Sequence, residues 1–131
     1  CESPACTANC PTGAMRKTAD GTVQHDDELC IGCQTCVQSC PYGVPKLFEG
    51  DMKVRKCDAC IAFRQAGKNP VCVDACPMRA LDFGDTDELK SKYGSAVVSE
   101  LPCMPDGGTG QNVLVKPKDC TLEDAFRSVI I

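Results

Sequence analysis

The sequence is poor in large apolar and aromatic side chains. Its 131 residues include no tryptophan, only two tyrosines and only four phenylalanines. A chain of this length forms one domain or two very small ones, and a purely hydrophobic core made from these residues would be thin. We therefore expect metal ions or disulfide bonds to hold the fold together.

Several functional classes lack their usual sequence features here. Fourteen basic residues against eighteen acidic ones give a net charge of −4, which argues against a nucleic-acid partner. No apolar stretch approaches the roughly 18 residues of a membrane span, and no secretory signal peptide is visible. His25 is the only histidine, and there is no Ser/His/Asp set and no dinucleotide fingerprint, so we expect no catalytic residues.

Cysteine, in contrast, is abundant, and all but two of the thirteen cysteines fall into three runs that each end in C-x-x-x-C-P. This is an internal repeat with variable spacing. The first run holds Cys1, Cys6 and Cys10; the second holds Cys30, Cys33, Cys36 and Cys40; the third holds Cys57, Cys60, Cys72 and Cys76. Cys103 and Cys120 lie outside the runs and are predicted to be ordinary thiols on loops.

The middle run carries the most specific pattern. Its letters, CIGCQTCVQSCP, follow the C-x-x-C-x-x-C-x-x-x-C-P spacing of a bacterial 4Fe-4S site. Three cysteines at three-residue steps let a tight loop wrap one cubane, and Gly32 lets the main chain approach the sulfides closely. In two-cluster ferredoxins the fourth cysteine binds the other cluster.

That rule predicts which cysteines share a cluster. One complete set is Cys10, Cys30, Cys33 and Cys36; a second, lacking one ligand, is Cys1, Cys6 and Cys40; a third, also lacking one, is Cys57, Cys60 and Cys72, with Cys76 directed to another cluster. We expect a further run upstream, so that an intact parent carries four runs and up to four 4Fe-4S clusters. The first residue is Cys rather than Met, which agrees with an N-terminally truncated fragment.

Three other interpretations of the cysteines are possible. The four cysteines of the third run suit tetrahedral zinc, because C-x-x-C pairs also bind that ion. A secreted disulfide framework prefers an even number of cysteines, whereas this chain has thirteen. Cys1 could be a lipidated first residue, but its spacing to Cys6 and Cys10 favours a ligand.

The segments before the third run predict little chemistry. Thr22 and Val23 favour a short extended segment that leads into the middle run, and His25 is interpreted as a surface residue. Lys53, Arg55 and Lys56 precede a predicted cluster, where positive charge would raise its potential; a solvated basic strand is the alternative.

The later segments predict local structure. The insert of the third run favours a brief helix that Gly67 ends. Asp85 and Glu88 have the spacing of a capping box, followed by a helix over 86–93 with Gly94 as its stop. A short strand is expected over 113–115. The last residues place four apolar side chains on one helical face: Leu122, Phe126, Val129 and Ile130.

Together, the three runs and the segment CPMRALDFGDTDELKSKYG resemble the iron-sulfur subunit of anaerobic dimethyl sulfoxide reductase, one of the four-cluster subunits of molybdopterin oxidoreductases. NVLVKP near the end resembles that family's tail, so the resemblance runs from Cys1 to about Pro117. Some relatives have another residue at the third position of the middle run and hold a three-iron cluster. Here that position is Cys36, so four irons are expected.

The resemblance implies an α+β fold of ferredoxin-like 4Fe-4S domains with short strands, short helices and long cluster-binding loops. We expect a ferredoxin-type domain over 1–50, part of a second ferredoxin-like unit over 51–100 and a C-terminal extension over 101–131. The implied function is non-catalytic electron relay between a quinol-oxidising membrane anchor subunit and a molybdopterin catalytic subunit. The implied location is peripheral on the bacterial cytoplasmic membrane, at its periplasmic face. The alternatives are a free-standing polyferredoxin and a structural zinc protein.

Overall fold

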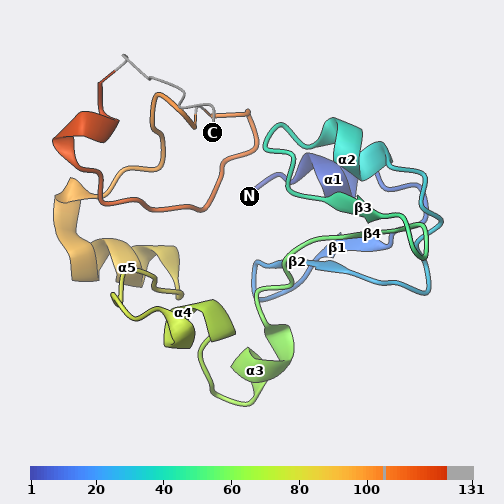
Figure 1. Cartoon of the computed structure of the whole chain (residues 1–131), viewed down its shortest axis with the longest axis horizontal. Coiled ribbons are helices and arrows are strands. Elements are labelled where there is room, and N and C mark those ends of the chain that lie inside the picture. The colour runs from blue at the N-terminus through green and yellow to red at the C-terminus, as the bar shows by residue number, and fades with distance from the viewer. Residues whose placement is uncertain (105, 124–131) are drawn as a thin grey trace. The chain divides into compact units, whose positions relative to one another are not determined.

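The computed structural model describes residues 1–104 and 106–123 of the chain. The contacts divide the chain into two compact units, Cys1–Phe83 and Gly84–Ile131, and the first unit contains all three cysteine runs (Figure 1). Over the described ranges, no helix has the length and apolar character required to cross a membrane. The domain boundaries at 50 and 100 stay predictions.

The first unit is built from very short elements. Two helices, α1 (Ala5–Ala8) and α2 (Thr35–Ser39), pack against each other. Strand β1 (Met15–Lys17) pairs antiparallel with β2 (Val23–His25), and β3 (Lys46–Phe48) pairs antiparallel with β4 (Lys53–Arg55). These two separate hairpins and the long loops between them match the α+β, ferredoxin-like fold that the sequence predicts (Figure 1).

Polar side chains and positive-φ residues form the hairpin turns. In the β1–β2 turn the Thr18 hydroxyl donates to Asp20 and to the main-chain oxygen of Thr22. In the β3–β4 turn Asp51 accepts from the main-chain N–H of Lys53, and Met52 has φ 56°. These turns fix the register of each hairpin, and β2 confirms the extended segment predicted at Val23.

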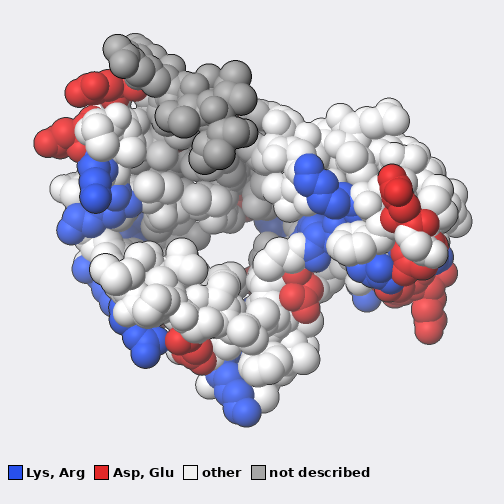
Figure 2. Space-filling view, viewed as in Figure 1, with Lys and Arg blue, Asp and Glu red and all other residues white. Residues whose placement is uncertain are grey.

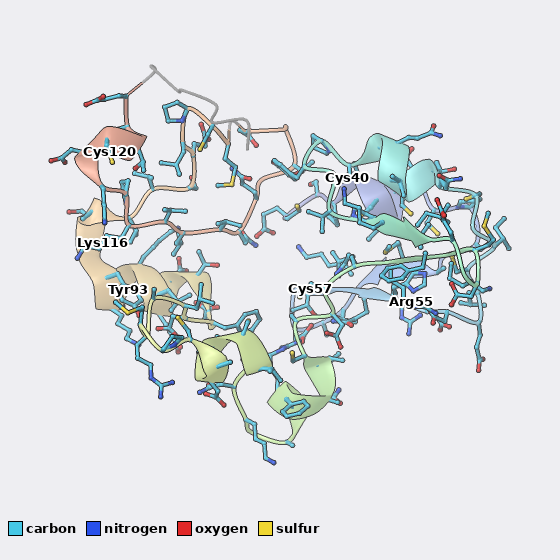
Figure 3. The ribbon with its side chains drawn as sticks, in the orientation of Figure 1. Cys40, Arg55, Cys57, Tyr93, Lys116 and Cys120 are labelled. Carbon is cyan, nitrogen blue, oxygen red and sulfur yellow. The ribbon has the colours of Figure 1, made fainter. Side chains whose placement is uncertain are left out.

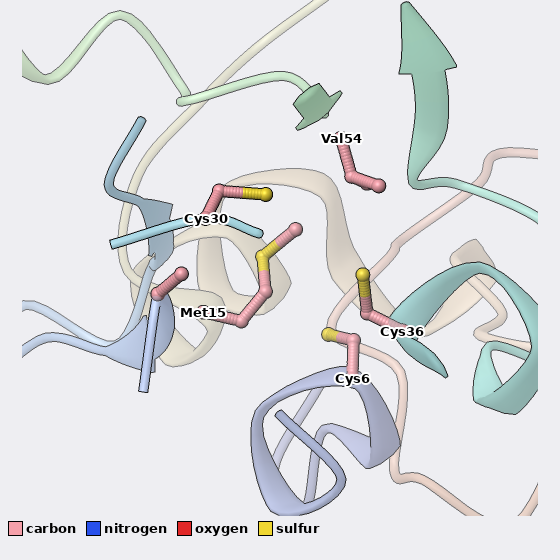
Figure 4. Packing of buried hydrophobic residues seen from close by; sticks show 6 residues of the cluster. Cys6, Met15, Cys30, Cys36 and Val54 are labelled. Atoms are coloured by element: carbon pink, nitrogen blue, oxygen red, sulfur yellow. The ribbon is translucent and has the colours of Figure 1, made fainter. Parts of the chain in front are cut away.

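The buried core of the first unit is as thin as the composition predicts. It consists of Cys6, Ala14, Met15, Cys30, Cys36 and Val54. Half of these residues are cysteines whose side chains converge on the space around Met15 and Val54 (Figure 4). Burial of so few apolar side chains supplies little hydrophobic stabilisation, so this fold needs an additional source of stability.

The third run forms two further short helices, α3 (Ile61–Gln65) and α4 (Val71–Ala75). Neither helix buries a residue. Helix α3 confirms the brief helix predicted in the insert, which ends just before Gly67 at φ 70°.

The second unit contains α5 (Thr86–Tyr93) and the 3-10 helices η1 (Gly94–Ala96) and η2 (Asp119–Thr121). Helix α5 has the predicted bounds, because the Asp85 carboxylate accepts from the main-chain N–H groups of Asp87 and Glu88, and Gly94 follows with φ 74°. Asp85 therefore works as the predicted N-cap.

Two predictions for the tail have different outcomes. The strand expected over 113–115 is wrong, because only Val115 forms an isolated bridge, with Val98; one pair of hydrogen bonds does not continue into a ladder. Leu122 directly follows η2, whereas the other residues of the expected terminal helix lie outside the described residues.

Candidate iron-sulfur centre

The loop of the middle run depends on a glycine. Gly32 has φ 70°, and a Cβ added there would lie 2.2 Å from the main-chain oxygen of Met52. The loop therefore passes directly against the β3–β4 turn, at a distance that only glycine permits. Lys53 of the same hairpin donates to the main-chain oxygen of Cys30, so the hairpin holds the start of the loop in place.

The same loop then turns into α2. Gln34 has φ 61° and precedes the first residue of the helix, Thr35. This left-handed residue reverses the direction of the backbone between Cys33, which is exposed, and Cys36, which is buried in the first turn of α2. The loop thus presents successive cysteines from different directions, as a wrapped cluster requires.

The four cysteines of the predicted complete set line one cavity. Cys10 from the first run and Cys30, Cys33 and Cys36 from the middle run all contribute to its wall, together with Met15 and Val54. The cavity and its mouth contain about 290 Å³ of space without protein atoms, part of it open to solvent. The structure therefore brings together residues that the ligand rule grouped from spacing alone.

Electrostatics also shows that these four sulfurs are close together. Burial raises the pKa of the Cys36 thiol, and the thiolates of Cys10, Cys33 and Cys30 raise it further. A site that accumulates four thiolates at close quarters is unfavourable without a cation. The donor set therefore fits a metal cluster, whose positive irons would compensate the thiolate charge.

Two of the four sulfurs already accept local hydrogen bonds. The main-chain N–H of Met15 lies 3.4 Å from Cys10 Sγ, and the Thr35 hydroxyl lies 3.4 Å from Cys33 Sγ. Thr35 lowers the pKa of Cys33. Burial raises the pKa of Cys10, but its hydrogen bonds with Met15 and Thr12 outweigh this and leave the pKa lowered. Lower pKa values favour the thiolate form that binds metal.

The second predicted set is partly assembled. Cys6 is buried in α1, and burial followed by the charge of Cys40 raises its pKa. Packing of α1 against α2 brings these two cysteines together, since Cys40 directly follows α2 (Figure 3). Cys1 is half-buried at the start of the chain.

The third predicted set is the most open. Cys57 and Cys72 are exposed, whereas Cys60 and Cys76 are half-buried. Cys57 Sγ and Cys76 Sγ accept main-chain N–H groups from Ala59 and Ala80, each at 3.4 Å. The two left-handed residues Ala59 and Cys60, with φ 54° and 48°, start α3.

The structure does not favour zinc or disulfides as the alternative chemistry. All thirteen cysteines are free. Within residues 1–104 and 106–123, no three His, Cys, Asp or Glu side chains gather in the way that a single metal ion requires. Tetrahedral zinc with bonds of about 2.3 Å needs its sulfurs within about 4 Å of one another, whereas the four irons of a cubane separate the ligands further. Cys103 and Cys120 are exposed, and Cys120 lies in η2 instead of a loop.

The interpretation of His25 as a surface residue is wrong. Its side chain is only 8% exposed, and it lines the same cavity as the four cysteines. The reason is the β1–β2 register, which places His25 opposite the buried Met15. The alternation of Val23 and His25 in a strand was the available signal, since residues two apart share a face.

The basic residues after the β3–β4 turn have different environments. Arg55 pairs with Asp27 and Asp51 at the surface, so its charge is largely neutralised. Burial lowers the pKa of Lys56, and the thiolates of Cys57 and Cys6 oppose this. Lys56 therefore lies between cysteines of the second and third sets. Elsewhere on the visible face, Lys and Arg are interspersed with Asp and Glu (Figure 2).

A small α+β fold whose loops direct free cysteines from two runs into one cavity defines a ferredoxin-type iron-sulfur protein. Residues 1–86 match the model of the 4Fe-4S dicluster domain, and this chain therefore belongs to that family. Its cofactors are 4Fe-4S clusters, as the middle run predicts.

The chain is also similar to curated proteins over most of its length. It is 49% identical over 117 residues to the B subunit of the anaerobic dimethyl sulfoxide reductase of Haemophilus influenzae, and 48% identical over 118 residues to the subunit of the same name from Escherichia coli. Each alignment covers 89% of this chain and 57% of the relative. A third relative, Protein NrfC of Escherichia coli, is 44% identical over 94 residues, which are 70% of this chain and 42% of that protein.

The chain therefore spans a little over half the length, 57%, of the reductase subunits that it matches. The resemblance inferred from the cysteine runs is confirmed by these relatives. The relatives are named as one subunit of a reductase, which bears on the function proposed next.

Proposed function

We propose that the chain is a non-catalytic electron-transfer subunit that relays electrons through 4Fe-4S clusters between a quinol-oxidising membrane anchor subunit and a molybdopterin catalytic subunit. The observation that carries this proposal is the cavity lined by Cys10, Cys30, Cys33 and Cys36. A 4Fe-4S cluster bound there would accept and release one electron at a time. The high identity to reductase subunits favours a subunit over a free-standing polyferredoxin.

The proposal assigns the cysteine ligands by set. One cluster is bound by Cys10, Cys30, Cys33 and Cys36; a second by Cys1, Cys6 and Cys40 with one further ligand; a third by Cys57, Cys60 and Cys72 with one further ligand; and Cys76 serves another cluster. The shared cavity supports the first set, and the electrostatic coupling of Cys6 with Cys40 supports the second. The domain boundaries at 50 and 100 belong to the same proposal.

The chain's own residues would hold the clusters and adjust their charge. Main-chain and hydroxyl donors at Cys10 and Cys33 reduce the negative charge on the sulfurs. The Lys56 ammonium lies near Cys6 and Cys57, where its charge would favour the reduced state of both neighbouring clusters.

We place the complex peripherally on the bacterial cytoplasmic membrane, at its periplasmic face, with this chain attached through its partner subunits. The support is the similarity to one subunit of a reductase named as having several. The location is tested by fractionation of cells that express the whole complex: the chain should leave the membrane fraction when the anchor subunit is deleted.

Metal content tests the cluster assignment. The chain, purified without oxygen, should contain about four irons and four sulfides, or a higher multiple, because each cubane holds four of each. Cys36→Ser should remove about four irons and four sulfides, whereas Cys103→Ser, at an exposed thiol outside the runs, should remove none.

About one or two zinc ions without sulfide would contradict the assignment and leave a zinc-stapled domain. Equal loss of iron in both variants would contradict the specific role given to Cys36.

A further inference from the structure

One buried side chain in the cluster cavity has no assigned role. His25 is 8% exposed and contributes to the cavity wall together with the four cysteines of the first set. Its Nε2 is buried and has no hydrogen-bond partner among the described residues. Burial of an unpaired polar nitrogen is costly, so an orphaned imidazole nitrogen in a native fold indicates a missing partner.

The other side of the ring is held in place. His25 Nδ1 lies 3.0 Å from Asp27 Oδ1. The second carboxylate oxygen of Asp27 accepts from Arg55 Nη2 at 2.7 Å and from Arg55 Nε at 3.1 Å, and Arg55 also pairs with Asp51. Asp27 is half exposed. A carboxylate that holds one ring nitrogen fixes the orientation of the other, and here the other nitrogen remains on the buried side.

The missing partner must be something that the cavity receives. The proposed occupant, a cluster with four cysteine thiolates, carries net negative charge on its sulfurs, and hydrogen bonds to these sulfurs raise the reduction potential. A donor stabilises the more negative, reduced state more than the oxidised state, because hydrogen bonds to charged acceptors are stronger.

We propose that His25 donates a hydrogen bond from Nε2 to a sulfur of the cluster bound by Cys10, Cys30, Cys33 and Cys36, and thereby raises the reduction potential of that cluster relative to the others in the chain. The inference rests on the function proposed above. Four thiols already supply one ligand for each iron, which leaves the histidine as a donor and not as a ligand.

Removal of the donor tests this inference. His25→Leu keeps an apolar side chain of similar reach, and His25→Gln retains an N–H group. Met15→Leu is the matched control, because Met15 is buried in the same wall, the exchange conserves volume and its main-chain N–H remains. The variants are loaded with iron and sulfide without oxygen, and each cluster is followed by electron paramagnetic resonance during a redox titration.

At a fixed potential, His25→Leu should lower the ratio of reduced to oxidised cluster about tenfold, which equals about 59 mV for a one-electron couple. His25→Gln should recover most of this loss, and Met15→Leu should show none. Pulsed resonance should detect one exchangeable proton near this cluster in the original chain and in Met15→Leu, but not in His25→Leu.

Each outcome has a separate meaning. Absence of iron and sulfide from the original chain would overturn the proposed function itself. An intact cluster with unchanged potential and unchanged proton coupling in His25→Leu would overturn only the role of His25, as would a strong nitrogen coupling of a direct iron ligand in the original chain.

If His25→Leu does not assemble the cluster, Asp27→Asn carries the test. This change keeps the imidazole but weakens the contact that orients it, so the reduction potential should fall in the same direction by a smaller factor. An unchanged potential in a fully loaded Asp27→Asn variant would overturn the proposal.

Discussion

The middle and third cysteine runs have related spacing but different surroundings. The middle run closes around a cavity with two of its cysteines, Cys30 and Cys36, buried in the core. The third run starts and ends with the same pairs of cysteines, yet Cys57 and Cys72 are exposed and the helices α3 and α4 bury no residue. Similar ligand patterns therefore do not give similar packing.

The difference comes from what each run packs against. The middle run lies against the β3–β4 turn, which touches Gly32 and binds the main chain at Cys30. The third run has polar ties to the β1–β2 turn, where Arg64 pairs with Asp20 at 2.8 Å and Gln24 donates to the main-chain oxygen of Asp58. Such ties position a loop, but they bury little apolar area and add little stability.

The largest expected effect tests this contrast at two glycines. Gly32 and Gly67 both have φ 70°, but only Gly32 has a neighbour within 4 Å. Gly32→Ala combines a left-handed alanine, about 1–2 kcal/mol, with a main-chain clash of about 1–3 kcal/mol. Gly67→Ala carries only the first cost. Urea unfolding of the loaded chain should give these losses, and Gly32→Ala should also lower the iron content.

Equal destabilisation by the two alanines would show that the close approach at Met52 is not maintained in solution. The comparison then rests on backbone conformation alone, which is the same at both glycines.

The second prediction compares thiol reactivity in the metal-free chain. Burial raises the pKa of Cys36, whereas the main-chain N–H of Ala80, against a smaller opposing effect of burial, lowers the pKa of Cys76. A thiol with a lowered pKa is deprotonated at lower pH, so alkylation of Cys76 should begin at lower pH than alkylation of Cys36. Mass spectrometry after brief alkylation at pH 7 should show Cys76 labelled faster, on the order of tenfold for each unit that separates the pKa values.

An unfolded metal-free chain serves as the control, because in urea the two rates should converge. Faster labelling of Cys36 in the native chain would contradict the burial of the middle run.

The smallest expected effect is one that the two runs should share. Gln34 before α2 and Ala59 before α3 have φ 61° and 54°. Glycine there would relieve about 1–2 kcal/mol of left-handed strain but lose about 0.5–1 kcal/mol through its greater freedom when unfolded. Gln34→Gly and Ala59→Gly should therefore each raise the unfolding free energy by about 0.5 kcal/mol, measured in urea. A loss at Gln34 alone would show that its side chain contributes to the cavity wall, where it lies.

Local sequence signals predicted the parts of the fold that depend on neighbouring residues. The bounds of α5 follow from Asp85 and Gly94, because a cap and a stop act within a few residues. Helix α3 and its end before Gly67 were predictable for the same reason. The ligand rule also grouped Cys10 with the middle run, because the spacing of a cluster loop leaves one cysteine free to reach a second site.

The prediction for residues 113–115 failed for a related reason. Strand propensity at Val113 and Val115 says only that an extended segment is favourable, whereas a ladder requires a partner of matching length. Val98 supplies a single bridge to Val115, and one bridge does not make a strand.

The order of the residues alone accounts for the chemistry of this protein: free cysteines at cluster spacing, short helices with their own caps, and a core too small to stand on apolar packing alone. Which polar groups face the cluster cavity, in contrast, depends on the folded arrangement. His25 became part of the cavity wall through the β1–β2 register, and Lys56 came to lie beside Cys6 and Cys57. Burial and charge at a site depend on residues far apart in the sequence, and only folding brings those residues together.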